Sequence, residues 1–108
     1  MLFRSRVVGG IFSSFKGEVS SAATNTSYTM FDTGANYACY IVSVIGIAAD
    51  ASNYSTTAVV NMQNTSVSIS YIDAGGLIFI TNSGTAIQVN QNSGAPMTTI
   101  LWSAMRIA

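Results

Sequence analysis

The chain has 108 residues, with four basic and four acidic side chains, no histidine and one cysteine. Hydrophobic residues make up 49% of it, and Ser, Thr, Asn and Gln supply 37 residues more. This length fits a single domain, and an apolar chain with so little charge is not intrinsically disordered. Four cations are also too few for the basic surface that binds a phosphate backbone, which excludes nucleic acid as a partner.

The same inventory argues against an enzyme. Without histidine the chain has no Ser-His-Asp or Cys-His pair, and it lacks the ligands of an ordinary zinc site. Three of the four carboxylates, Asp32, Asp50 and Asp73, fall in turn clusters, where Asp is common for backbone reasons. Asp50 and Asp73 could share one end of a β-sandwich, but we expect no catalysis, no metal and no cofactor.

Hydrophobic runs are too short for a membrane segment. The longest, residues 40–49, has ten residues and is interrupted by Ser43 and Gly46, whereas a spanning helix needs roughly 20. The apolar stretch 7–12 follows two arginines but is too short for a cleaved signal peptide. We therefore expect no membrane insertion.

The first 26 residues differ in character from the rest. They hold three of the four basic residues, the aromatic side chains Phe3, Phe12 and Phe15, and a polar stretch over 20–26. We interpret residues 1–26 as an N-terminal arm that precedes a domain over 27–108. Two roles are open for this arm: docking onto a partner through Phe3, Phe12 and Phe15, or folding back as an extra strand.

From residue 27 onward the pattern predicts β-strands separated by turns. The turn clusters contain Asn, Asp, Gly and Ser, and the runs between them contain the Val, Ile, Thr, Tyr and Phe that favour sheets. The expected strands are 27–31, 37–48, 54–62, 66–72, 77–81, 85–90 and 98–107. About seven short strands without a helical period predict an all-β, antiparallel, jelly-roll-like sandwich.

Two of these strands are apolar on both faces. In 37–48, residues Tyr40, Val42 and Val44 alternate with another apolar set, and in 98–107 so do Ile100 and Trp102. A sandwich covers only one face of each strand, so the second face needs another copy of the chain. We assign Tyr40, Val42, Val44, Ile100 and Trp102 to an oligomer interface; the alternative is a closed barrel with a somewhat apolar exterior.

Alternating turns identify a possible recognition surface. If consecutive strands are antiparallel, the turns 32–36, 63–65 and 82–84 lie at one end. Loops on a rigid scaffold commonly carry recognition, and amide side chains suit the hydroxyl groups of saccharides. We therefore expect Asn36, Asn64 and Asn82 to line a receptor-facing surface.

Three segments carry a resemblance to a known class of proteins. They are 40–60 (YIVSVIGIAADASNYSTTAVV), 76–89 (GLIFITNSGTAIQV) and 90–107 (NQNSGAPMTTILWSAMRI). With its near-terminal aromatic residue, closing Arg-Ile and Asn-Ser-Gly turns, this pattern resembles the C-terminal tip (head) domains of bacteriophage tail fibres and other small β-sandwich virion proteins. Such domains are usually homotrimers that bind a cell-surface saccharide or protein.

The resemblance implies a non-enzymatic, homotrimeric structural protein of the virion, assembled in the host cytoplasm and located at a tail fibre tip. It would adsorb to a host-surface receptor, most simply a saccharide, and would contact other virion proteins through the arm. Two alternatives remain open: a trimeric capsid cement (decoration) protein on the capsid surface, and a small sugar-binding lectin. The position of Trp102 within a strand favours a core or interface role over sugar stacking.

Overall fold

The computed structural model describes residues 13–108, which form eight strands and no helix. Within this range no helix is long and apolar enough to cross a membrane. The strands are β1 (Ser14–Ala22), β2 (Thr26–Asp32), β3 (Asn36–Ala48), β4 (Asn53–Asn64), β5 (Ser66–Asp73), β6 (Ile78–Ser83), β7 (Ala86–Gln91) and β8 (Met97–Arg106).

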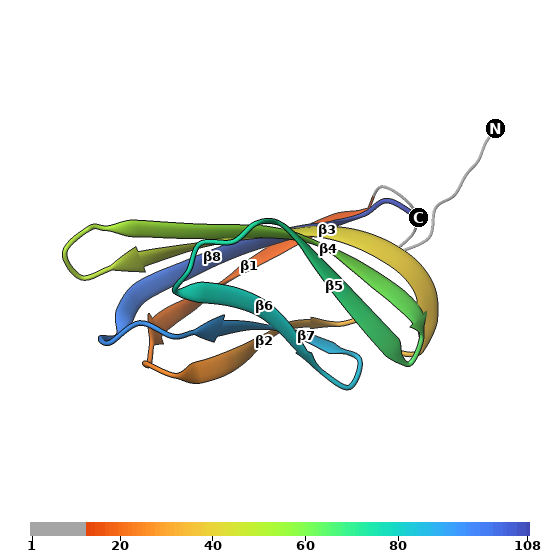
Figure 1. Ribbon diagram of the computed structural model, residues 1–108, viewed down its shortest axis with the longest axis horizontal. Helices are drawn as coiled ribbons and strands as arrows, with labels where there is room; N and C mark the ends of the chain where they lie inside the picture. Colours follow the sequence, from red (N-terminus) through yellow and green to blue (C-terminus); the bar gives the residue numbers. More distant parts are fainter. Residues whose placement is uncertain (1–12) are drawn as a thin grey trace.

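These strands form two antiparallel sheets packed face to face (Figure 1). The larger sheet has the order β1-β8-β3-β4-β5, and the smaller one has the order β2-β7-β6. The predicted all-β antiparallel sandwich is therefore confirmed, with one strand more than expected. The long β3–β4 hairpin projects past the end of the smaller sheet (Figure 1).

The extra strand, β1, comes from the segment predicted to be an arm. Its pairing with β8 runs from Ser14 opposite Met105 to Ala22 opposite Met97. Of the two roles predicted for residues 1–26, the described part therefore adopts that of an extra strand and not that of a separate arm. The period-two alternation of apolar and polar residues in β1 is interrupted by Gly17, which weakened its signal in the sequence.

Of the three phenylalanines predicted to dock onto a partner, the structure describes only Phe15. Phe15 lies in β1 and packs against Phe31, with ring centroids 4.8 Å apart, so its assignment to docking was wrong. Phe15 is part of the sandwich because its position in β1 turns it toward the smaller sheet. Phe3 and Phe12 lie outside the described residues.

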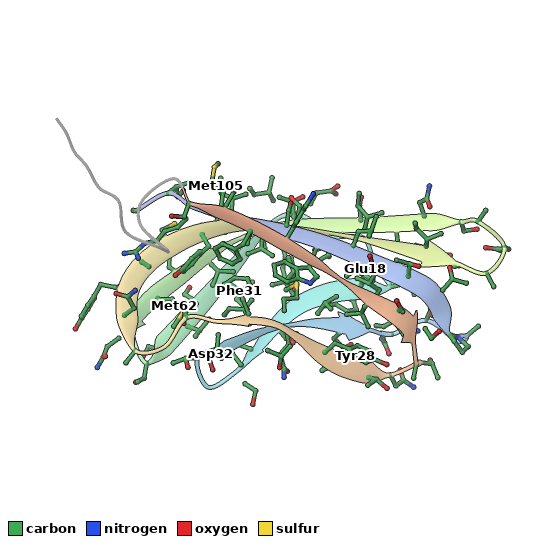
Figure 2. All side chains as sticks on the ribbon, turned by 180° about the vertical axis from the view of Figure 1, so that it is seen from behind. Glu18, Tyr28, Phe31, Asp32, Met62 and Met105 are labelled. Carbon is green, nitrogen blue, oxygen red and sulfur yellow. The ribbon has the colours of Figure 1, made fainter. Side chains whose placement is uncertain are left out.

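An aromatic cluster joins the two sheets. Phe31 of the smaller sheet stacks on Trp102 of the larger one, at a centroid distance of 5.8 Å, and lies 5.4 Å from Tyr40. Figure 2 shows Phe31 between the layers. Trp102 also covers Gly17, where an added Cβ would lie 2.7 Å from the indole. The cluster thereby fixes which face of β3 and β8 points inward.

That orientation contradicts the predicted oligomer interface. Tyr40, Val42, Val44 and Ile100 are buried between the sheets of one chain, and Trp102 packs against the same core. The prediction was wrong because both faces of these strands are apolar, and alternation alone does not tell which of two apolar faces the second sheet covers.

The opposite face carries the excess apolar surface that the sequence predicted. Ile45, Leu101 and Met105 are 44%, 42% and 39% exposed, respectively, and Met105 stands on the far side of the larger sheet (Figure 2). Cys39 lies half-buried on this outer face as well. More apolar strand surface exists than the two sheets enclose.

A buried hydroxyl group ties the two sheets together. Thr56 of β4 is fully buried. Its Oγ1 donates to the carbonyl oxygen of Ile78 at 2.6 Å and accepts from the amide of Gly75 at 2.8 Å. One side chain therefore links β4 to β6 and positions the loop between β5 and β6.

Replacing Thr56 by Val should destabilise the fold. The substitution nearly preserves volume but leaves the buried Ile78 carbonyl and the part-buried Gly75 amide without their partner, which costs about 1–3 kcal/mol. Thr29→Val is the matched control, because the Thr29 hydroxyl accepts only an exposed bond from Gln88. Urea denaturation should separate the two variants, and equal stability would contradict this role of Thr56.

Candidate functional site

Three turns meet at one end of the sandwich. Asn36 lies directly opposite Asn64 in the β3–β4 register, and the amide of Thr33 donates to the carbonyl of Thr85 at 3.1 Å. The second contact joins the β2–β3 turn to the β6–β7 turn, which follows Asn82 (Figure 1). The structure thus brings the turns 32–36, 63–65 and 82–84 together, as the antiparallel topology predicted.

Each of the three predicted asparagines also has a local backbone role. The Asn36 side-chain oxygen accepts from the amide of Tyr37 at 2.8 Å, and Asn82 donates to the carbonyl of Gly84 at 3.0 Å. Asn64 adopts φ = 64° in the two-residue β4–β5 turn, where Asn is favoured. These roles explain why Asn stands in the turns, and their contact with a receptor stays a prediction.

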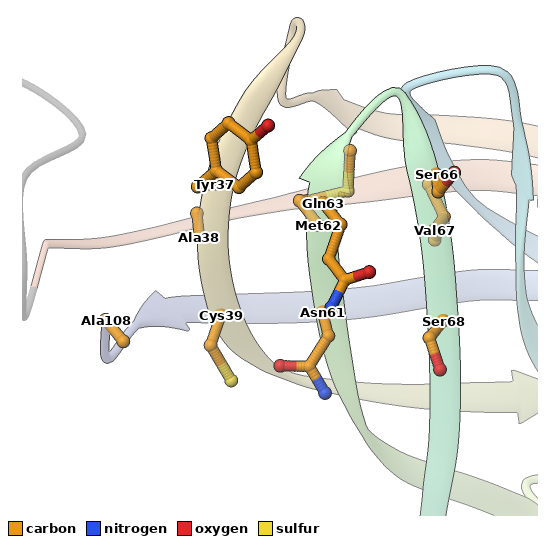
Figure 3. A pocket seen from close by; sticks show the side chains of 10 residues that line it. All are labelled: Tyr37, Ala38, Cys39, Asn61, Met62, Gln63, Ser66, Val67, Ser68 and Ala108. Carbon is orange, nitrogen blue, oxygen red and sulfur yellow. The ribbon is translucent and has the colours of Figure 1, made fainter.

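A cleft of about 520 Å³ opens on the outer face of β3, β4 and β5 (Figure 3). The strand register arranges its side chains in two rows across the sheet. The first row is Tyr37, Gln63 and Ser66, and the second is Cys39, Asn61 and Ser68. The remaining lining residues are Ala38, Met62, Val67 and Ala108.

The cleft offers polar groups that the fold leaves free. The side chains of Asn61, Gln63, Ser66 and Ser68 make no hydrogen bond within residues 13–108. Figure 3 shows the Gln63 side chain extending toward Asn61. Amides and hydroxyls both donate and accept hydrogen bonds, so these groups can exchange bound water for the hydroxyl groups of a ligand.

An aromatic ring completes the cleft. The Tyr37 side chain is 73% exposed, whereas aromatic side chains commonly pack in protein cores. Among residues 13–108, no Asp, Glu, Lys or Arg side chain lines the cleft. An exposed aromatic ring beside free amides and hydroxyls fits a neutral ligand rich in hydroxyl groups better than it fits an ion.

Sequence reasoning missed this set because it depends on pairing across three strands. Within one strand, the serines at 66 and 68 and the polar pair Asn61 and Gln63 each alternate with apolar residues. That alternation places each pair on one face. Only the register brings both pairs next to Tyr37.

The turn carboxylates have structural partners. Asp32 accepts from the amide of Gly34 at 2.9 Å and from the hydroxyl of Thr85 at 2.7 Å, and these bonds lower the pKa of Asp32 below its usual value. Asp50 accepts from the amide of Ser52 at 3.0 Å, which lowers the pKa of Asp50 in the same way. Both residues are ionised turn-capping groups.

Asp50 and Asp73 do not form a catalytic pair. Asp73 lies opposite Thr57, whereas Asp50 lies in the turn beyond Asn53. The four-residue step from 57 to 53 alone spans about 13 Å of strand, and paired carboxyl groups in glycosidases are about 5–9.5 Å apart. Among residues 13–108, no three His, Cys, Asp or Glu residues gather to hold a metal ion.

A second cleft, of about 390 Å³, lies near the β3–β4 turn, away from the three joined turns. Its lining includes Tyr54, Leu77 and Pro96, together with Asp50. Since Asp50 is engaged in its own turn and most other lining side chains are apolar or small, this cleft offers fewer free polar groups than the first.

Comparison with known proteins identifies related folds. No protein-family model and no curated protein matches the chain. The tailspike protein of Acinetobacter phage vB_ApiP_P1 has a TM-score of 0.60 and 13% identity, covering 100% of this chain and 24% of its own. Tailspike gp49 of Acinetobacter baumannii bacteriophage Fri1, a capsular polysaccharide depolymerase, has a TM-score of 0.59 and 13% identity, covering 90% and 17%, respectively.

What these proteins share with this chain is the fold. The chain spans a quarter or less of either tailspike. The sandwich therefore matches one part of a much longer phage protein. The resemblance to phage fibre proteins inferred from the sequence agrees with these neighbours.

Removing the Thr85 hydroxyl should raise the pKa of Asp32. A lowered pKa in the folded chain means that ionised Asp32 stabilises the fold above its unfolded pKa of about 4, and that this contribution is lost as the pH falls through the folded value. In Thr85→Val the Asp32 pKa should move back toward 3.8, as measured by an NMR titration of the carboxyl carbon. The Asp50 pKa should not change, and an unmoved Asp32 pKa would refute the contact.

Proposed function

We propose that this chain is a non-enzymatic structural domain of a phage tail that binds a polysaccharide on the host cell surface. The fold neighbours support the tail assignment, since both are phage tailspike proteins and one is described as a capsular polysaccharide depolymerase. The proposed binding site is the cleft formed by Tyr37, Asn61, Gln63, Ser66 and Ser68.

The observation that carries this proposal is the set of free polar side chains around an exposed ring. A sugar presents hydroxyl groups at its edges and C–H groups on its faces. The amides of Asn61 and Gln63 can bond the hydroxyls, while the ring of Tyr37 offers an apolar surface for a sugar face. The described residues that line the cleft include no cationic side chain, which favours neutral sugar units over acidic ones.

The finer assignment is a homotrimeric tail fibre tip in the virion. The receptor-facing turns predicted from the sequence fit this assignment, because Asn36 and Asn64 are the chain neighbours of the cleft residues Tyr37 and Gln63. Asn82 lies at the same end of the sandwich. Attachment to the remainder of the tail, and assembly in the host cytoplasm, are parts of the same proposal. A capsid cement role receives no support from the fold neighbours, and a free lectin would use the same cleft.

Substitutions in the cleft should weaken saccharide binding. Tyr37→Ala removes the ring, and Asn61→Ala removes an amide; each should raise the dissociation constant about tenfold or more, as expected for a central contact. The measurement is calorimetric titration with oligosaccharides from purified bacterial capsules and lipopolysaccharide O-chains, using one to which the unmodified protein binds.

The matched control is Asn53→Ala. Asn53 is an exposed asparagine of the same strand, at the end of β4 far from the cleft, so its loss should leave affinity unchanged. Wild-type affinity in both Tyr37→Ala and Asn61→Ala would contradict the proposed site. Failure of the unmodified protein to bind any of these saccharides would contradict the proposed function.

A further inference from the structure

We infer that copies of this chain associate through the outer face of the larger sheet. The contact surface, here called the outer patch, consists of Ile41, Ile45 and Ile47 of β3, Val59 of β4, and Leu101 and Met105 of β8. This inference deepens the proposed function, which includes a homotrimer, by naming the face that another copy covers.

The strand register places these residues in neighbouring rows on one face of the sheet. Ile41 lies opposite Met105 on one side and Val59 on the other, and Ile45 lies opposite Leu101. Directly opposed residues in a sheet share a face and contact each other. The outer patch therefore crosses β4, β3 and β8 in one apolar row and β3 and β8 in the next, with the hydroxyl residues Thr57, Ser43 and Ser103 between the two rows. A groove of about 150 Å³ lies beside Ile45 and Leu101.

The two edge strands of the same sheet, β1 and β5, present polar side chains on the outer face. On β5 the outward residues are Ser66, Ser68 and Ser70, and on β1 the outward residues include Lys16 and Glu18. The outer face is thus most apolar along β3 and β8 and polar toward both of its edges. This is the arrangement of an interface, in which a dry core is surrounded by a polar rim.

Two of the three hydroxyl groups in the row that crosses the outer patch, those of Ser43 and Thr57 but not that of Ser103, are paired with each other. The Ser43 and Thr57 hydroxyls lie 3.1 Å apart and hydrogen-bond each other. Burial of a polar group is costly chiefly when its hydrogen bond is lost. Covering this part of the face with another copy therefore leaves these two hydroxyls satisfied.

The charges beside the outer patch identify the partner as a second copy. Lys16 and Glu18 lie two residues apart on the outward side of β1, opposite Ser103 and Leu101. A strongly acidic or basic partner would be attracted by one and repelled by the other. Another copy of the same face supplies both signs, so Lys16 of one chain can pair with Glu18 of the next, and the chain as a whole has no net charge to oppose association.

The first experiment measures native mass by sedimentation equilibrium. The unmodified protein should have a mass that is a multiple of 11.3 kDa, with three copies expected. Leu101→Asn should raise the dissociation constant about tenfold or more, because it places an amide in a dry apolar contact. Ile72→Asn is the matched control: Ile72 is 64% exposed on the edge strand β5, and its replacement should not change the mass.

Charge exchange tests the choice of partner. Lys16→Glu and Glu18→Lys should each weaken association, and the double variant should restore it, because reciprocal pairs form again between copies. Fluorescence of the single tryptophan reports folding in every variant, since Trp102 lies against Phe31. Both charged side chains are exposed, so these variants should fold even where Leu101→Asn does not.

A one-copy mass for the unmodified protein would overturn the inference, as would an unchanged mass in both Leu101→Asn and Lys16→Glu. The saccharide-binding proposal fails separately. A one-copy protein that still binds an oligosaccharide through Tyr37 would contradict only the outer patch. An associated protein that binds no saccharide would contradict only the cleft.

Discussion

The other features of the structure depend on one interaction, the packing of four aromatic rings between the two sheets. These rings belong to Phe15, Phe31, Tyr40 and Trp102. Strands β3 and β8 are apolar on both faces, so either face is a chemically acceptable core. The ring of Phe31 stacks on Trp102, and Gly17 leaves room for the indole on the neighbouring strand. With this face turned inward, Ile45, Leu101 and Met105 must point outward, which creates the outer patch.

Features that depend on local sequence were predictable. Alternation and turn residues identified the strands from β2 to β8, and antiparallel order placed three turns at one end because each tight turn reverses the chain. Strand β1 was left ambiguous, since Gly17 and a Ser-rich end dilute its alternation. The inward face of β3 was assigned wrongly, since Tyr40 and Ile41 are similarly apolar and only the second sheet distinguishes them.

The cleft depends on pairing that no single segment contains. Tyr37, Gln63 and Ser66 come from three strands and form one row only through the register of β3, β4 and β5. The tight turn at Asn64 fixes half of that register, because it sets Gln63 opposite Ser66. Cleft and outer patch occupy the same face of the larger sheet, the cleft toward β5 and the outer patch toward β8. One sheet thus provides a polar surface for a ligand and an apolar surface for a neighbouring copy.

The most direct test is a crystal structure of the purified protein in its native state of association. We expect neighbouring copies to bury Ile45, Leu101 and Met105, while Tyr37 and Asn61 remain open to solvent. A structure in which that apolar strip faces water in every copy, or in which the Tyr37 cleft is sealed by another chain, would contradict this division of the sheet.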